Sequence, residues 1–93
     1  MSIVSKQVFY AGRVQGVGFR YSAKQIVKGF DVTGWVRNLP DGRVELQASG
    51  EESEVIALLK ALRESHLNSH ITNETETTLA EPVSMRGFVI RHD

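Results

Sequence analysis

Residues 11–20, AGRVQGVGFR, combine three glycines with two arginines directly before a helical pattern. Glycines allow successive backbone N–H groups to turn into one concavity, which attracts an anion. A helix that begins after the turn adds unpaired N–H groups and the positive end of its dipole. Arg20 closes the segment with a guanidinium whose planar fork matches two phosphate oxygens. These residue types predict a phosphate site, while a tight strand–helix turn remains the alternative use of the glycines.

Asn38 is the second candidate, at the end of a predicted strand in the segment GWVRN. Its side-chain amide both donates and accepts hydrogen bonds, so it can orient a small polar molecule. An asparagine before LPDG also opens a turn, and the residues alone leave this second use open. Trp35 and Arg37 alternate with Val36 and therefore point to the other face of the strand, where we expect Trp35 to pack.

The residue sets of other common sites are missing from the sequence. GRVQGVG has neither the GK[ST] ending of a Walker loop nor the G-x-G-x-x-G spacing of a dinucleotide fold. The chain has no cysteine, which removes disulfides, thiolate nucleophiles and zinc–thiolate sites. His66 and His70 are four residues apart, but they straddle a predicted helix end and no carboxylate completes a ligand set. We therefore expect neither a metal nor another cofactor.

The glycine turn must be held between a strand and a helix. Residues 6–13, KQVFYAGR, are rich in β-forming residues and predict the strand. Apolar residues at helical spacing predict the helix that follows: Phe19, Ala23, Ile26, Val27 and Phe30. Gly29 is placed to end that helix in a left-handed conformation. Residues 31–38 and 43–49 alternate as strands, and LPDG joins them as a hairpin.

A second helix is predicted to follow the hairpin. Ser49 and Glu52 match a capping box at its start. The helix is expected to run to about His66 with one apolar face, made of Val55, Leu58, Leu59 and Leu62. Residues 70–79 predict a polar, edge-like strand, and residues 87–92 predict a closing strand.

The predicted order is β-α-β-β-α-β with a short extra strand. Two helices on one face of an antiparallel sheet make an α+β protein of two layers. Glu45 and Gln47 alternate with the apolar residues of their strand. We therefore expect the sheet face opposite the helices to be open to water.

Length, composition and charge limit the classes of function. The 93 residues predict one domain over 1–93, with 41% hydrophobic and 24% charged residues. The net charge is zero, which argues against nucleic-acid binding. The charges are unevenly distributed, however: residues 1–43 contain seven basic and two acidic residues, whereas residues 44–93 contain four basic and nine acidic residues. The glycine turn lies in the positive half, which favours an anion. No apolar run is long enough to span a membrane, and the start MSIVSKQ is unlike a signal peptide, so we expect a cytoplasmic protein. Nothing in the sequence calls for more than a monomer.

The segments GRVQGVGFR, GWVRN and DGRVE together resemble the acylphosphatase family, and the likeness runs from about Val8 to Gly50 and resumes in GFVIRH. The resemblance implies a ferredoxin-like α/β sandwich that hydrolyses the carboxyl–phosphate bond of acyl phosphates. It places the catalytic residues at Arg20 and Asn38, and the phosphate-binding loop at Gln15, Gly16, Val17, Gly18, Phe19 and Arg20. The family commonly has Gly-Pro after the second helix, whereas this chain has ESHLNSHI, which leaves the path to the fourth strand open.

Such a site needs no histidine, cysteine or carboxylate at its centre. Arg20 and the loop N–H groups would stabilise the phosphoryl charge, while Asn38 would orient a water. Neither side chain titrates near neutrality, so we expect a rate that is independent of pH there and of chelators. The same loop would take inorganic phosphate or sulfate, and the sequence indicates no pocket for the acyl part.

Two alternatives use a related fold. One is a non-catalytic module that binds phosphate or carbamoyl phosphate without turnover. The other is an RNA-recognition domain, which stacks bases on aromatic residues of its central strands. The strand RVELQAS offers Glu45 and Gln47 in those places, and together with the neutral net charge this disfavours RNA.

Overall fold

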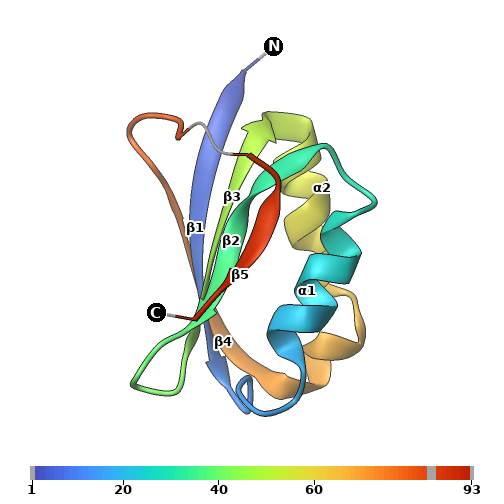
Figure 1. The fold of residues 1–93 in the computed structure, drawn as a ribbon, viewed down its shortest axis with the longest axis vertical. Helices are drawn as coiled ribbons and strands as arrows, with labels where there is room; N and C mark the ends of the chain where they lie inside the picture. The colour runs from blue at the N-terminus through green and yellow to red at the C-terminus, as the bar shows by residue number, and fades with distance from the viewer. Residues whose placement is uncertain (1, 84–85, 93) are drawn as a thin grey trace.

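The fold is built on one five-stranded sheet with the order β4-β1-β3-β2-β5 (Figure 1). A computed structural model describes residues 2–83 and 86–92. The strands are β1 (Ile3–Gly12), β2 (Val32–Asn38), β3 (Val44–Glu51), β4 (Ile71–Thr78) and β5 (Phe88–Arg91). The helices are α1 (Phe19–Val27), α2 (Glu52–Arg63) and a short 3-10 helix, η1 (His66–His70). No helix in the described ranges is long and apolar enough to cross a membrane.

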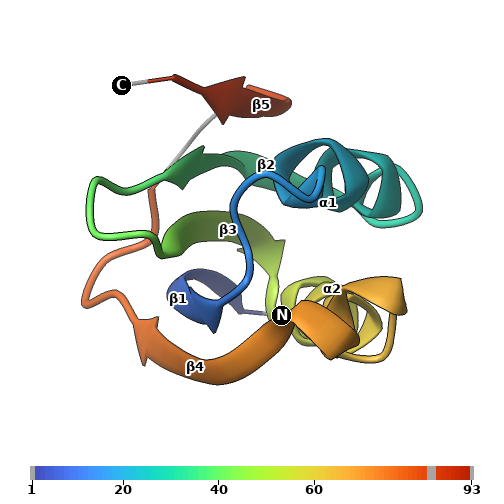
Figure 2. The ribbon, with the colours of Figure 1, turned by 90° about the horizontal axis from the view of Figure 1, so that it is seen from below.

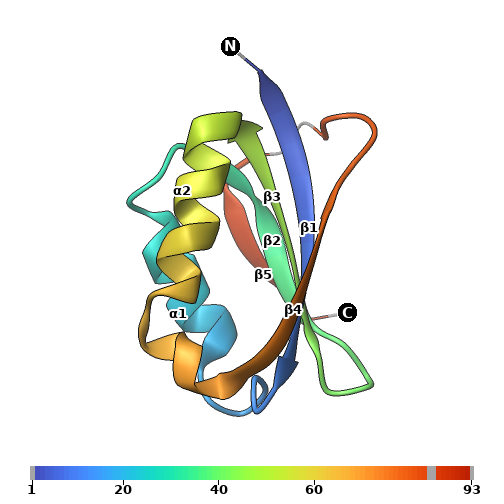
Figure 3. The same ribbon diagram turned by 180° about the vertical axis from the view of Figure 1, so that it is seen from behind.

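Both α-helices cover the same face of the sheet, as the sequence predicts (Figures 2 and 3). Their apolar faces pack on the inward side chains of the three central strands and form the core, which includes Val8, Val36, Leu46, Ala23, Val27, Val55, Leu58 and Leu62. β1 and β2 flank β3, so the connection through α1 brings the end of β1 and the end of β2 to one end of the sheet. That end carries both candidate segments.

The sheet is mixed, which corrects the fully antiparallel prediction. β5 pairs in parallel with β2, with Gly34 opposite Phe88. The cause lies in the connection before it. β4 is antiparallel to β1 and ends beside Lys6, near the start of β1, at the end of the sheet where β2 also begins. A strand that crosses over from there to the far edge must run in the direction of β2.

The path after the second helix, open at the level of sequence, is now defined. α2 ends at Arg63, short of the predicted His66, and η1 leads into the polar edge strand β4. The Ser65 hydroxyl accepts a hydrogen bond from the backbone N–H of Leu67 and thereby caps η1. Leu67 is fully buried, so this short helix closes one side of the core.

Two predicted helix ends are wrong. Gly29 does not take a left-handed conformation, because the chain leaves α1 through a tightened right-handed turn in which its N–H donates to the Ile26 carbonyl at 3.1 Å. Ser49 does not cap α2, because β3 continues to Glu51 and the buried Ser49 hydroxyl lies 2.6 Å from that of Ser5. The carbonyl of Ser2, the residue before β1, instead accepts a hydrogen bond from the Glu52 N–H at 2.8 Å.

The sheet face opposite the helices is largely covered rather than open to water. Glu45 is only 4% exposed, since Gln7 Nε2 donates to it at 2.6 Å and Arg37 pairs with it at 2.8 Å. The guanidinium groups of Arg37 and Arg91 lie over the Trp35 ring, 5.1 and 4.8 Å from its centroid. Long side chains from neighbouring strands thus cover polar groups that the alternation pattern placed in solvent.

Candidate active site

The loop between β1 and α1 has the backbone conformation of an anion-binding nest. Gly16 and Gly18 have φ angles of 77° and 75°, whereas no described residue other than glycine has a positive φ. The sign of φ therefore alternates through Gln15, Gly16, Val17 and Gly18, and such alternation points successive N–H groups into one concavity. A Cβ on either glycine would meet no atom within 4 Å. Backbone conformation, rather than space, requires glycine here.

α1 begins directly at this concavity and leaves its first N–H groups without helical partners. Gly18 is the N-cap, no side chain caps the helix, and its first turn contains no acidic residue. Phe19 fixes this start, because its side chain is 2% exposed and its ring lies 5.1 Å from that of Tyr10. Burying a side chain of that size contributes about 1.5–3 kcal/mol. The free N–H groups and the helix dipole favour an anion at this point.

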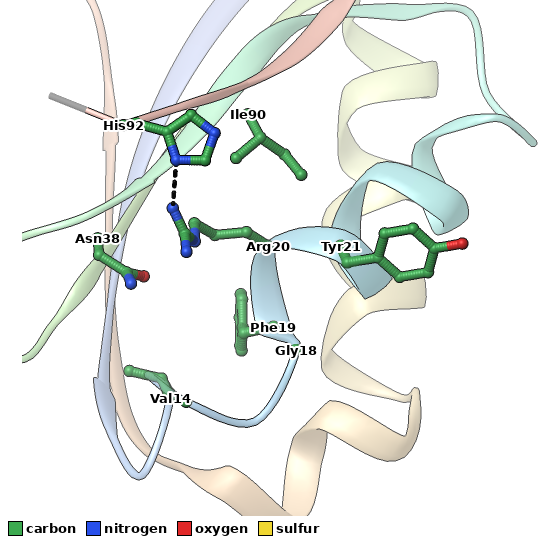
Figure 4. A pocket seen from close by; sticks show the side chains of 9 residues that line it. Val14, Gly18, Phe19, Arg20, Tyr21, Asn38, Ile90 and His92 are labelled. Carbon is green, nitrogen blue, oxygen red and sulfur yellow. Dashed lines mark hydrogen bonds between the residues drawn. The ribbon is translucent and has the colours of Figure 1, made fainter.

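A pocket of about 180 Å³ lies at the end of the loop and is lined by Val14, Gly16, Gly18, Phe19, Arg20, Tyr21, Asn38, Ile90 and His92. The side chains of Arg20, from α1, and Asn38, from the end of β2, both point into this space (Figure 4). Five of the residues predicted for the site thus share one pocket: Gly16, Gly18, Phe19, Arg20 and Asn38. Gln15 and Val17 do not line it.

The Gln15 side chain turns away from the pocket and toward the β2–β3 hairpin. Both hydrogens of its side-chain amide are engaged, because Nε2 donates to the carbonyls of Leu39 at 2.7 Å and of Arg43 at 2.9 Å. These carbonyls belong to the hairpin turn that follows Asn38 directly. The Gln15 side chain therefore holds the loop against the strand end that carries Asn38.

Ile90 and His92 are site residues that the sequence analysis missed. Nη1 of Arg20 lies 3.3 Å from Nδ1 of His92, and this contact is drawn in Figure 4. The alternation of Phe88, Ile90 and His92 in the sequence places all three on one side of the closing strand. Their position at the pocket could not be predicted from this pattern alone, because it also depends on the pairing of β5 with β2, next to α1.

Two other titratable side chains near the site, Tyr10 and His66, contact neighbouring side chains and do not line the pocket. Burial raises the pKa of Tyr10 well above its usual range, so this phenol stays neutral behind Phe19. His66 Nε2 lies 3.2 Å from the Ser22 hydroxyl on α1. Within 2–83 and 86–92, no group of three or more His, Cys, Asp or Glu side chains is placed to hold a metal ion.

A family model described as Acylphosphatase matches residues 6–90. The chain belongs to the acylphosphatase family. It is 38% identical over 91 residues to an acylphosphatase of Trichormus variabilis, covering 96% of this chain and 87% of the relative. An acylphosphatase of Methylococcus capsulatus is 42% identical over 86 residues, which are 92% of this chain and 94% of the relative.

Solved acylphosphatases have the same architecture. The crystal structure of acylphosphatase from Bacillus subtilis superposes with a TM-score of 0.86 at 32% identity, covering 95% of this chain and 98% of that one. The ferredoxin-like α+β fold is therefore confirmed, with the mixed sheet described above. The identities over most of the chain also confirm an acylphosphatase hydrolase, whose family acts on small acyl phosphates.

Proposed function

We propose that this chain hydrolyses acyl phosphates to a carboxylate and inorganic phosphate without a metal ion, using Arg20 and Asn38. One observation supports this most directly. The nest, the start of α1 and the Arg20 guanidinium face the Asn38 amide across a single small pocket. A cationic cradle opposite a neutral polar group suits an anion attacked by water.

The cradle acts on the phosphoryl group. Charge in phosphoryl transfer spreads over the equatorial oxygens, so positioning and electrostatic stabilisation account for most of the catalysis. Arg20 supplies two parallel N–H donors, and the loop and helix N–H groups supply further donors from fixed positions. The same donors would bind the product phosphate, and sulfate in its place.

Asn38 acts on the water. Its amide can accept a hydrogen bond from the water and donate another, which holds the oxygen in line with the bond that breaks. The leaving carboxylate is a weak base and needs no general acid. The substrate's own phosphate oxygens can accept the proton of the water, so the pocket needs no catalytic base.

The direct test is turnover of benzoyl phosphate with and without a chelator. We expect steady hydrolysis at the same rate in excess EDTA, because no step requires a metal. Loss of activity in EDTA that a divalent cation restores would contradict the metal-free mechanism. Binding of phosphate with no hydrolysis would instead favour the non-catalytic module. A matched measurement on Asn38→Ala guards against activity from a contaminating phosphatase.

We also propose that residues 1–93 work as one domain and as a cytoplasmic monomer. The single continuous core and the match over residues 6–90 support one domain. A pocket assembled from one copy of the chain supports a monomer, and the lack of cysteine is compatible with a reducing compartment. Light scattering and cell fractionation test the last two points.

A further inference from the structure

Two pockets follow one another along the seam between α1 and β5. Arg20 and Ile90 line the first, which is the phosphate pocket. The second has a volume of about 230 Å³, and its lining includes Lys24, Lys28 and Phe88. Arg20 and Lys24 on α1 and Lys28, its C-cap, recur every four residues and so lie along one side of the helix. Phe88 and Ile90 share one side of β5. The same two elements therefore line both pockets in the same order.

The second pocket is lined by apolar side chains and by two lysines. Its remaining lining is Val27, Phe30 and Val32, all apolar. Lys24 is half-buried and Lys28 exposed, and across the described ranges neither side chain has a hydrogen-bond or ion-pair partner. No acidic residue occurs in α1. Like charges four residues apart on a helix repel one another, so a bound anion would relieve an unfavourable pair.

We propose that this second pocket binds the acyl part of the substrate, and that the preferred substrates are acyl phosphates with a short apolar chain ending in a second carboxylate. The inference rests on the proposed function. Lys24 is about 6 Å and Lys28 about 12 Å further along the helix axis than Arg20. With the phosphoryl group at Arg20, a short chain passes Ile90 and its distal carboxylate reaches Lys24, while its methylenes lie against Phe88.

Succinyl phosphate and butyryl phosphate test this directly, because they have the same number of carbons and differ in the distal group, a carboxylate or a methyl. We expect wild-type kcat/KM to be about fivefold higher for succinyl phosphate, the discrimination of one partly exposed ion pair. In Lys24→Gln this ratio should fall to about one. In Lys24→Glu it should fall below one, because the new carboxylate repels the distal group.

The control is Arg13→Gln, which removes one positive charge from an exposed residue of the glycine-rich segment outside both pockets. It should keep the wild-type ratio, whereas a ratio that falls as far as in Lys24→Gln would show only a general attraction for anions and overturn the subsite. A lower melting temperature of Lys24→Gln with the ratio unchanged would overturn it too, since Lys24 would then only complement the helix dipole.

The two proposals fail in different ways. Hydrolysis of both substrates by the wild-type chain with equal kcat/KM would overturn the subsite and leave the proposed function standing. Hydrolysis of neither would overturn the proposed function, and the subsite with it.

Discussion

Asn38→Ala is expected to lower kcat about 10²–10³-fold, the scale of losing one oriented polar group in an active site. Phosphate affinity should change little, because the proposed mechanism gives the contacts to the anion to Arg20 and the loop N–H groups. Asn38 lies at the end of β2 with its amide in the pocket, and alanine removes that amide without altering the strand. Stopped-flow assays with benzoyl phosphate give kcat, and competition by inorganic phosphate gives the affinity.

A suitable control is Asn73→Ala, which removes the same group from an exposed position on β4, at the far edge of the sheet. It should behave as the wild-type chain does. Asn38→Ala with normal kcat and much weaker phosphate binding would reverse the assignment, making Asn38 a ligand of the anion rather than of the water.

Arg20→Ala is expected to reduce both phosphate affinity and turnover, with kcat/KM lower by about 10³-fold or more, as for other arginines that stabilise transferring phosphoryl groups. In the proposed mechanism the guanidinium acts on both the ground state and the transition state, so KM should rise as kcat falls. Arg20→Lys should recover part of the affinity through its charge. It should recover less of the turnover, because an ammonium cannot supply two parallel donors.

Arg13→Ala separates direct contact from the general positive field. Arg13 has the same charge in the same glycine-rich segment, yet it does not line the pocket. It should lower kcat/KM by a small factor that salt abolishes. Near-normal phosphate affinity in Arg20→Ala, with circular dichroism showing an intact fold, would remove Arg20 from the cradle.

The sequence predicted those parts of the fold and site that depend on local patterns. Helical spacing of Phe19 and Ala23 located α1, and the glycines located the turn before it, because left-handed backbone selects this residue type. Asn38 and Arg20 converge because β1 and β2 run in the same direction on either side of β3, which the order of elements implies. Their catalytic roles stay predictions.

Features that depend on contacts between residues distant in the sequence could not be predicted from local patterns. Ser49 looks like a helix cap until Ser5, on another strand, is seen beside its hydroxyl. Glu45 looks exposed until Arg37 and Gln7 are placed around it. His92 becomes a site residue only once β5 is known to lie next to β2. In each case the deciding contact joins segments whose pairing is set by the whole sheet.

The two hydrogen bonds of Gln15 make the loop and the β2–β3 hairpin a single mechanical unit. The distance between the nest and the Asn38 amide is thereby set before any ligand binds, so binding costs little ordering. Because of this link, activity also depends on the order of the exposed turn between β2 and β3. Loosening of residues 39–43 by heat or mild denaturant would separate the two halves of the site while the core of the protein is still folded.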